Sequence, residues 1–284
     1  MTRHGHCRTL PRVGDDRYDG WELVESGLRD ADTTILLLAG ALCSGDFYVD
    51  LVAEPALADC RLVAATLPGF AGTPAPPDPS VEASAAYGAQ LAREIGADVV
   101  VGHSLGANHA LEMAASGAFT GPVVLLSPSF SAEDEMKELR VLVKADKVPG
   151  LGKVAWSLAM KAVPKGLGKM VPEQHRDSLV AGVKRNEAAS CRASIGPYWA
   201  YLERHGSLVE RLCGSGVKAW VVFGDHDEVG LTDDERQGLE LCPSITLVPP
   251  LESTHLVMLD QPAQCAAIVR EAVTVASASP TPGM

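Results

Sequence analysis

Three groups of residues in this sequence could act together as a nucleophile, a base and an acid. Ser104 is the central residue of the pentapeptide GHSLG (102–106), Asp225 and Asp227 lie close together later in the chain, and His255 follows them. A serine hydroxyl becomes a useful nucleophile when a histidine takes its proton and a carboxylate orients that histidine. The residue types therefore predict acyl-transfer chemistry, with Ser104 as the nucleophile and His255 as the base.

The surroundings of Ser104 favour this interpretation over an idle serine in a glycine-rich turn. Three valines at 99–101 predict a short buried strand, and the run Ala107–Ala115 predicts a helix. A G-x-S-x-G sequence between a strand and a helix is the pattern of a nucleophile elbow. The sharp turn exposes the hydroxyl, and it aims the Leu105 N–H at negative charge forming beside the serine.

The elements that must position these residues alternate between strand and helix. This alternation predicts a mostly parallel sheet with helices on both faces. We expect strands at Gly20–Ser26, Thr33–Leu38, Arg61–Leu67, Val99–Val101, Pro122–Leu126, Lys218–Phe223 and Ser244–Val248, and helices at Ser80–Ile95, Ala107–Ala115, Asp233–Leu241 and from Asp260 or Gln261 onward.

The segment 131–205 interrupts this alternation. It reads as three or four helical pieces, with no strand before Val217, and its net charge is +4 in a chain whose net charge is −12. These features predict an inserted helical cap, although chance variation among solvated helix faces would give the same charge imbalance. Apolar residues at helical spacing form a stripe that we expect to be shared by two pieces meeting at a bend, because Pro164, Gly166 and Gly168 interrupt it: Trp156, Met160, Val163, Leu167 and Met170.

The stripe has two interpretations. It either attaches the cap to the core or forms an apolar wall of the substrate pocket, for which methionine is well suited. In the second interpretation, the pocket residues are Leu42, Trp156, Met160 and Met170.

These patterns together resemble the α/β-hydrolase superfamily, in particular serine hydrolases with a helical cap. The similarity extends from about Trp21 to about Ala276, and the order serine, aspartate, histidine matches the order in that family. The segments LPGFAGTP (67–74) and LVMLDQP (256–262) resemble the family's loop after the fourth strand and its stretch from the catalytic histidine into the last helix. The resemblance is to esterase-like, thioesterase-like and C–C hydrolase-like members.

The resemblance also implies roles for the acid and for the oxyanion hole. Relatives carry Gly-x-x-Asp after the corresponding strand, which aligns Asp227 with the acid and leaves Asp225 to fix the loop. The oxyanion donors would be the backbone N–H groups of Ala41 and Leu105. The chain departs from the pattern at Ala39, where many relatives have a histidine that braces this loop.

Composition limits the remaining possibilities. No apolar run is long enough to span a bilayer, and residues 1–16 lack the apolar core of a signal peptide. Seven scattered cysteines without C-x-x-C spacing favour reduced thiols, and we therefore expect a cytoplasmic protein. An acidic chain without a basic patch disfavours nucleic acid as a partner.

The sequence thus predicts an N-terminal arm at 1–19, a core formed by 20–130 and 206–276, the cap at 131–205 and a disordered tail at 277–284. The predicted activity is hydrolysis of a carboxylic ester or thioester of a small to medium, largely apolar substrate, through an acyl-enzyme and without metal or cofactor. A C–C bond hydrolase, lyase or cyclase with the same triad, and a non-catalytic ligand-binding protein on the same fold, are the alternatives. We expect a small-molecule partner and no membrane partner, and the oligomeric state stays open.

Overall fold

A seven-stranded sheet forms the centre of the molecule in the computed structural model, which describes residues 19–278. The strand order is β1-β3-β2-β4-β5-β6-β7, and β1 pairs antiparallel with β3 whereas every other pairing is parallel. The predicted mostly parallel sheet is therefore confirmed. The strands are β1 Glu22–Gly27, β2 Thr34–Leu38, β3 Arg61–Thr66, β4 Val99–His103, β5 Val123–Leu126, β6 Ala219–Val222 and β7 Ile245–Leu247.

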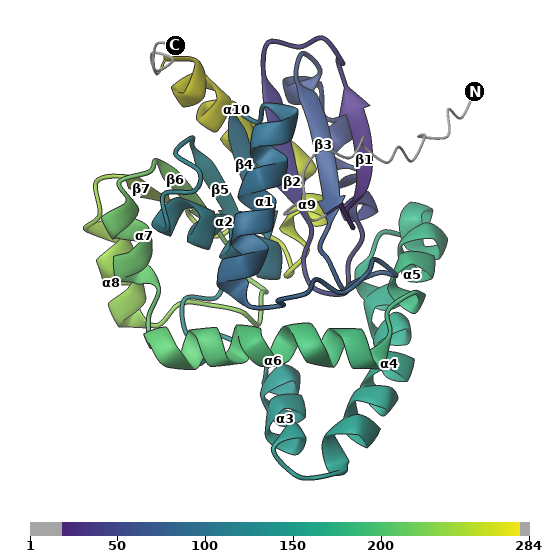
Figure 1. Cartoon of the computed structure of the whole chain (residues 1–284). Coiled ribbons are helices and arrows are strands. Elements are labelled where there is room, and N and C mark those ends of the chain that lie inside the picture. Colours follow the sequence, from purple (N-terminus) through teal and green to yellow (C-terminus); the bar gives the residue numbers. More distant parts are fainter. Residues whose placement is uncertain (1–18, 279–284) are drawn as a thin grey trace.

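Helices cover both faces of the sheet (Figure 1). The helices of the core are α1 Val81–Ile95, α2 Leu105–Ala115, α7 Val209–Ser215, α8 Asp233–Glu240, α9 Val257–Asp260 and α10 Pro262–Ala278. Side chains of β2 point alternately to the two faces of the sheet. Leu36 and Leu38 pack with α1 and α2 on one face, and Ile35 and Leu37 pack with α9 and α10 on the other. A strand buried on both faces has to be apolar at every position, as the predicted β2 run is.

Most expected boundaries lie within two residues of the observed ones. Ser80 caps α1 by accepting a hydrogen bond from the N–H of Ala83, as a helix N-terminus requires. Helix α7 was not expected, and α10 runs to Ala278, so it includes the first two residues of the predicted tail. The rest of the predicted tail and nearly all of the predicted arm lie outside the described residues.

The segment predicted as a cap holds helices and no strand between β5 and β6. Its helices are α3 Lys137–Asp146, α4 Leu151–Met170, α5 Arg176–Lys184 and α6 Ala188–His205. Helix α6 runs across beneath the sheet, and α3 and α4 project away from it (Figure 1). The status of this segment as a separate domain stays a prediction.

The expected interruption at Pro164 is wrong, because α4 is one helix of 20 residues that contains Pro164, Gly166 and Gly168. A proline inside a helix removes one backbone hydrogen bond and crowds the preceding turn. Packing against α3, α5 and α6 supports α4 on several sides, and tertiary packing of this kind commonly outweighs intrinsic helix propensity.

Two further observations concern the chain between residues 19 and 278. No helix in this range is long and apolar enough to cross a bilayer. The six cysteines in it are all free thiols, and it contains no cluster of three or more metal-ligating side chains.

Candidate active site

Ser104 lies at the sharp turn between β4 and α2. Its backbone is in a strained region, with φ 51° and ψ −121°, which a residue other than glycine adopts only where its surroundings hold it. The flanking glycines are required by close approach: a Cβ on Gly102 would lie 2.3 Å from the Gly106 carbonyl oxygen, and a Cβ on Gly106 would lie 2.3 Å from that of Leu38. Strand, helix and neighbouring strand therefore meet closely enough to hold Ser104 in this conformation.

His255 and Asp227 form a hydrogen-bonded pair in the loops that follow β7 and β6. Nδ1 of His255 lies 2.9 Å from Oδ1 and 3.1 Å from Oδ2 of Asp227. The carboxylate side chain is fully buried, whereas the imidazole is 14% exposed. With Nδ1 bound to a carboxylate, the neutral imidazole keeps its other nitrogen, Nε2, free to accept a proton.

The environment of Asp227 favours its charged form. Burial by itself raises the pKa of this carboxyl, but the hydrogen bond and charge of His255, the Ser127 hydroxyl and the N–H of Val229 outweigh burial. The pKa of Asp227 is therefore lowered from its usual value, so the carboxylate stays ionised wherever His255 can act as a base.

Asp225, the alternative acid, is placed differently. Its Oδ1 accepts a hydrogen bond of 3.0 Å from the N–H of Ser253, and its side chain is 43% exposed. His226 is mostly exposed, and its Nε2 lies 3.8 Å from Asp225. Asp225 thus links the loops after β6 and β7, while Asp227 contacts His255.

His103 connects the elbow to the loop of His255. Its Nε2 lies 2.9 Å from the backbone carbonyl oxygen of His255, so Nε2 carries the proton and donates. Burial, followed by the proximity of His255, lowers the pKa of His103 to about 3, and the ring is neutral. The two rings lie 4.9 Å apart, centroid to centroid. His103 therefore supports the position of His255 and does not compete with it as a base.

The turn after β2 lies beside Ser104. A Cβ on Gly40 would lie 3.2 Å from the Cβ of Ser104 and 2.7 Å from Nδ1 of His103, so only glycine fits there. The turn closes through a hydrogen bond from the Cys43 N–H to the Gly40 carbonyl. Within residues 19–278, the N–H groups of Ala41 and Leu105 donate to no other protein group, as the predicted oxyanion donors must.

Sequence reasoning missed Asn186, which lies between α5 and α6. Its Nδ2 donates to the Leu42 carbonyl oxygen at 2.8 Å, and its Oδ1 accepts from the Ala71 N–H at 2.8 Å. One amide of the cap segment therefore holds two loops of the core. Leu42 has a positive φ of 67°, a strained conformation that this hydrogen bond helps to fix.

Ser127 was also missed. It follows β5 directly, is 1% exposed, and its Oγ donates to the His255 carbonyl oxygen at 3.4 Å in addition to its contact with Asp227. Its position was the sequence signal, because Ser127 directly follows a predicted strand and so lies at the edge of the sheet where the other site residues were expected. Asn186 gave no such signal, because it lies far from the elbow in sequence.

The predicted pocket residues have different environments. Leu42 and Met160 are half-buried and pack against the core. Trp156 is buried and lines a cavity of about 200 Å³ inside the cap segment, together with Val143 and Trp199, and neither Ser104 nor His255 lines that cavity. Met170 is 42% exposed. The pocket stays a prediction.

Cys43 is unsuited to be an alternative nucleophile. Its side chain is buried, and burial raises the pKa of its thiol to about 12. The reactive form of cysteine is the thiolate, which this environment disfavours.

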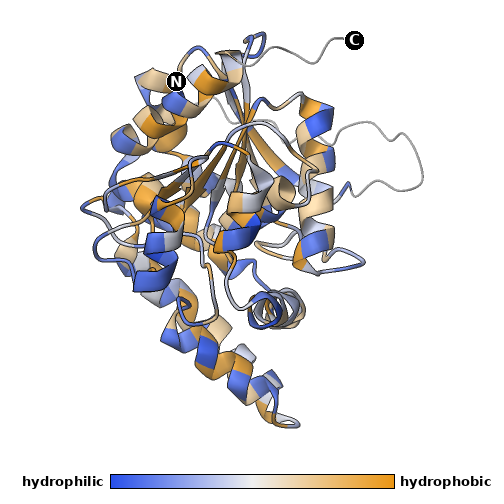
Figure 2. Cartoon of the chain, turned by 90° about the vertical axis from the view of Figure 1, so that its left-hand side faces the viewer, coloured by the Kyte–Doolittle hydropathy of each residue, from blue (hydrophilic) through white to orange (hydrophobic). Residues whose placement is uncertain are grey.

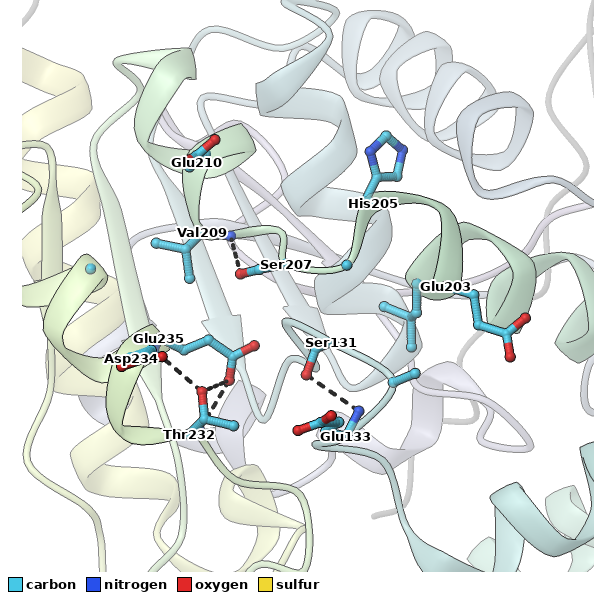
Figure 3. A pocket seen from close by; sticks show the side chains of 14 residues that line it. Ser131, Glu133, Glu203, His205, Ser207, Val209, Glu210, Thr232, Asp234 and Glu235 are labelled. Atoms are coloured by element: carbon cyan, nitrogen blue, oxygen red, sulfur yellow. Dashed lines mark hydrogen bonds between the residues drawn. The ribbon is translucent and has the colours of Figure 1, made fainter.

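A second pocket, of about 700 Å³, lies away from Ser104 and His255 (Figure 3). Its walls come from the loop after β5, the end of α6, α7 and α8, and five of its lining residues are acidic: Glu133, Glu203, Glu210, Asp234 and Glu235. Glu235 accepts hydrogen bonds from the hydroxyl and the N–H of Thr232, so it serves as part of the cap of α8.

Comparison with known proteins agrees with the fold. The chain belongs to the alpha/beta hydrolase family, whose model matches residues 35–268. It is similar in structure to an esterase from Thermogutta terrifontis, with 16% identity, a TM-score of 0.68, and coverage of 90% of this chain and 93% of the esterase. No curated protein sequence matches the chain.

Two further solved structures show how widely this fold is used. A thioesterase domain from the curacin biosynthetic pathway has 18% identity and a TM-score of 0.66, with coverage of 94% of this chain and 99% of the domain. An enol-lactonase from Burkholderia xenovorans has 18% identity and a TM-score of 0.66, with coverage of 89% and 96%. Likeness at this identity concerns the fold, and the chemistry has to be argued from the residues.

Proposed function

We propose that this protein is a serine hydrolase that cleaves a carboxylic ester or thioester. The observation that carries the proposal is the pair of His255 and buried Asp227 at the same end of the sheet as the strained elbow of Ser104. Ser104 Oγ attacks the acyl carbon while Nε2 of His255 takes its proton, and Asp227 stabilises the imidazolium that forms. The N–H groups of Ala41 and Leu105 stabilise the oxyanion.

The second half of the reaction follows from the same groups. The imidazolium of His255 gives its proton to the leaving alcohol or thiol as the tetrahedral intermediate collapses to the Ser104 acyl-enzyme. His255 then removes a proton from water as the water attacks the acyl carbon, and it returns this proton to Ser104 Oγ when the second tetrahedral intermediate collapses and releases the acid. No step requires a group beyond these five residues and water.

Labelling with a fluorophosphonate tests the nucleophile. We expect the probe to modify Ser104 in the wild type and in Cys43→Ala, and to leave Ser104→Ala unmodified. A ligand-binding protein without a working triad would resist the probe. Labelling of Ser104→Ala at the wild-type rate would assign the chemistry to another residue.

A substrate panel tests the bond that is cleaved. We expect turnover of p-nitrophenyl esters and acyl thioesters, and kcat/KM should rise from acetyl to hexanoyl because each CH₂ buried beside Leu42 and Met160 contributes at most ~0.8 kcal/mol. A charged succinyl ester should be a poor substrate. Cleavage of diketones without cleavage of esters would replace this proposal with C–C hydrolysis.

A further inference from the structure

The outward surface of α4 combines exposed apolar side chains with lysines. Leu151, Val154 and Leu158 are 49%, 56% and 61% exposed and recur at intervals of three and four, so they share one helix face. Val148, 49% exposed, precedes them in the turn between α3 and α4. Together with Val141 and Met170, these make up six of the eight large apolar side chains that are exposed within residues 19–278.

Positive charge accompanies this apolar face. Lys161 follows Leu158 by three residues, Lys165 and Lys169 continue the same face at intervals of four, and all three lysines are exposed. Helix α4 contains four lysines and no acidic residue, and the described part of the chain offers none of these lysines an ion-pair partner. The hairpin of α3 and α4 (137–170) has eight basic and two acidic residues, in a chain whose net charge is −12.

The shape of the hairpin agrees with an exposed docking element. It projects beneath the sheet (Figure 1), and hydrophobic and hydrophilic residues alternate along its ribbon (Figure 2). The buried side of α4 is already occupied, since Gly152 and Trp156 face α3 and α6. The apolar residues on the outer side are therefore not needed to hold the helix in place.

We propose that the outer face of α4 (Leu151, Val154, Leu158, Lys161, Lys165 and Lys169), together with Val148 of the preceding turn, binds the surface of an anionic lipid bilayer. A helix with an apolar face and flanking lysines lies in the interfacial plane of such a membrane, with its apolar side chains below the headgroups and its lysines among the phosphates. The acidic remainder of the chain is repelled by the same surface, so the charge distribution also orients the molecule.

A bilayer fits these observations better than other occupants do. A second copy of the chain would bring the lysines of two α4 helices together with no acidic residue on either helix to neutralise them. A protein partner would need an acidic groove matching a projecting ridge, whereas a bilayer deforms around it. The expectation of no membrane partner rested on the lack of a spanning run, and a helix lying in the interface needs no such run.

Vesicle flotation of the full chain tests the proposal independently of its hydrolytic activity. We expect binding to phosphatidylcholine vesicles that contain about one third phosphatidylserine, and little binding to pure phosphatidylcholine or at high salt. Replacing Lys161, Lys165 and Lys169 by glutamine should weaken binding about 100-fold, at about fivefold per lysine.

The apolar contribution needs its own variants. Val154→Asp with Leu158→Asp should weaken vesicle binding at least about tenfold, whereas Leu241→Asp, at a still more exposed leucine outside the hairpin, should not. Melting curves and turnover of a soluble ester check that each variant is folded. Equal binding to neutral and anionic vesicles, an equal effect of Leu241→Asp, or capture of an acidic polypeptide without vesicle binding would overturn the proposal.

Discussion

Two buried aspartates at the carboxyl end of the same sheet have opposite electrostatic environments. Asp227, after β6, accepts hydrogen bonds from His255 and from the Val229 N–H, and its pKa is lowered. Asp134, after β5, accepts hydrogen bonds from the N–H groups of Phe130 and Ser131 at 2.8 and 2.9 Å. Burial, and then the nearby Glu235, nonetheless raise the pKa of Asp134 to about 7.

The opposite pKa shifts of the two aspartates come from the neighbouring titratable side chain. Burial and backbone N–H donors do not explain them, because both carboxyls are buried and both accept hydrogen bonds from the backbone. A histidine beside Asp227 gains stability from a negative charge, whereas a second carboxyl beside Asp134 opposes one. Asp227 is therefore suited to orient a base that becomes cationic during a reaction. Asp134 is suited to keep its own proton beside Glu235, and because it contacts no proposed catalytic group, we expect its protonation to affect stability and not catalysis.

The largest effect on kcat is expected at Ser104, the proposed nucleophile of the site that contains Asp227. Ser104→Ala should lower kcat for p-nitrophenyl esters by about 10⁵-fold or more, because nothing else in the site can form the acyl-enzyme. Steady-state kinetics measure the loss, and unchanged melting shows that the fold is intact. Retained activity in Ser104→Ala, with loss in Cys43→Ala, would move the site to the turn after β2.

Substitution of both aspartates tests the comparison directly. Asp227→Asn should lower kcat by about 10⁴-fold, because the amide favours the wrong tautomer of His255. Asp134→Asn should leave kcat within about twofold, since Asp134 contacts no proposed catalytic group. Asp225→Asn is the matched control in the same loop, and if it were more damaging than Asp227→Asn, the two residues would exchange roles.

Ser127 provides a smaller test of how Asp227 is supported. Ser127→Ala removes a hydroxyl that contacts both Asp227 and the His255 carbonyl, and kcat should fall by about tenfold. In the double variant with Asp227→Asn, Ser127→Ala should lower kcat little further, because the two residues act through the same imidazole. Fully additive losses in the double variant would show that Ser127 acts elsewhere.

The smallest effect is expected on stability, at Asp134. The folded carboxyl keeps its proton up to about pH 7, whereas the unfolded one ionises near 3.8. Between these values the folded state binds more protons, so stability falls as pH rises and the loss is complete above pH 7. Between about pH 5 and about pH 8, the free energy of unfolding measured in urea should fall by about 1 to 2 kcal/mol more in the wild type than in Asp134→Asn. This energy is already reduced for partial solvent screening. Equal losses would mean that Asp134 is ionised throughout.

The sequence predicted what depends on local pattern. Buried strands such as β2 and the glycines around Ser104 follow from periodicity and close packing, and these fixed the fold and the elbow. The order of Ser104, an aspartate and His255 was recognised by its resemblance to the α/β-hydrolase superfamily, and the choice of Asp227 over Asp225 also came from that resemblance.

What depends on contacts between distant segments could not be predicted. The continuity of α4 through Pro164 is supported by three other helices, and the placement of Trp156 inside the cap segment depends on α3 and α6. Asn186 contacts loops more than one hundred residues away. A single sequence records none of these proximities, because helix periodicity specifies a face but not its neighbour.

Asn186 also limits which changes the segment 131–205 tolerates. Grafting a different cap between residues 131 and 205 removes the partner of both the Leu42 carbonyl and the Ala71 N–H. A chimera with a different segment would therefore lose the conformation of the turn that contains Ala41, whatever specificity the new segment has. A transplanted segment has to place its own amide here, so the segment 131–205 and the turn after β2 have to be exchanged together.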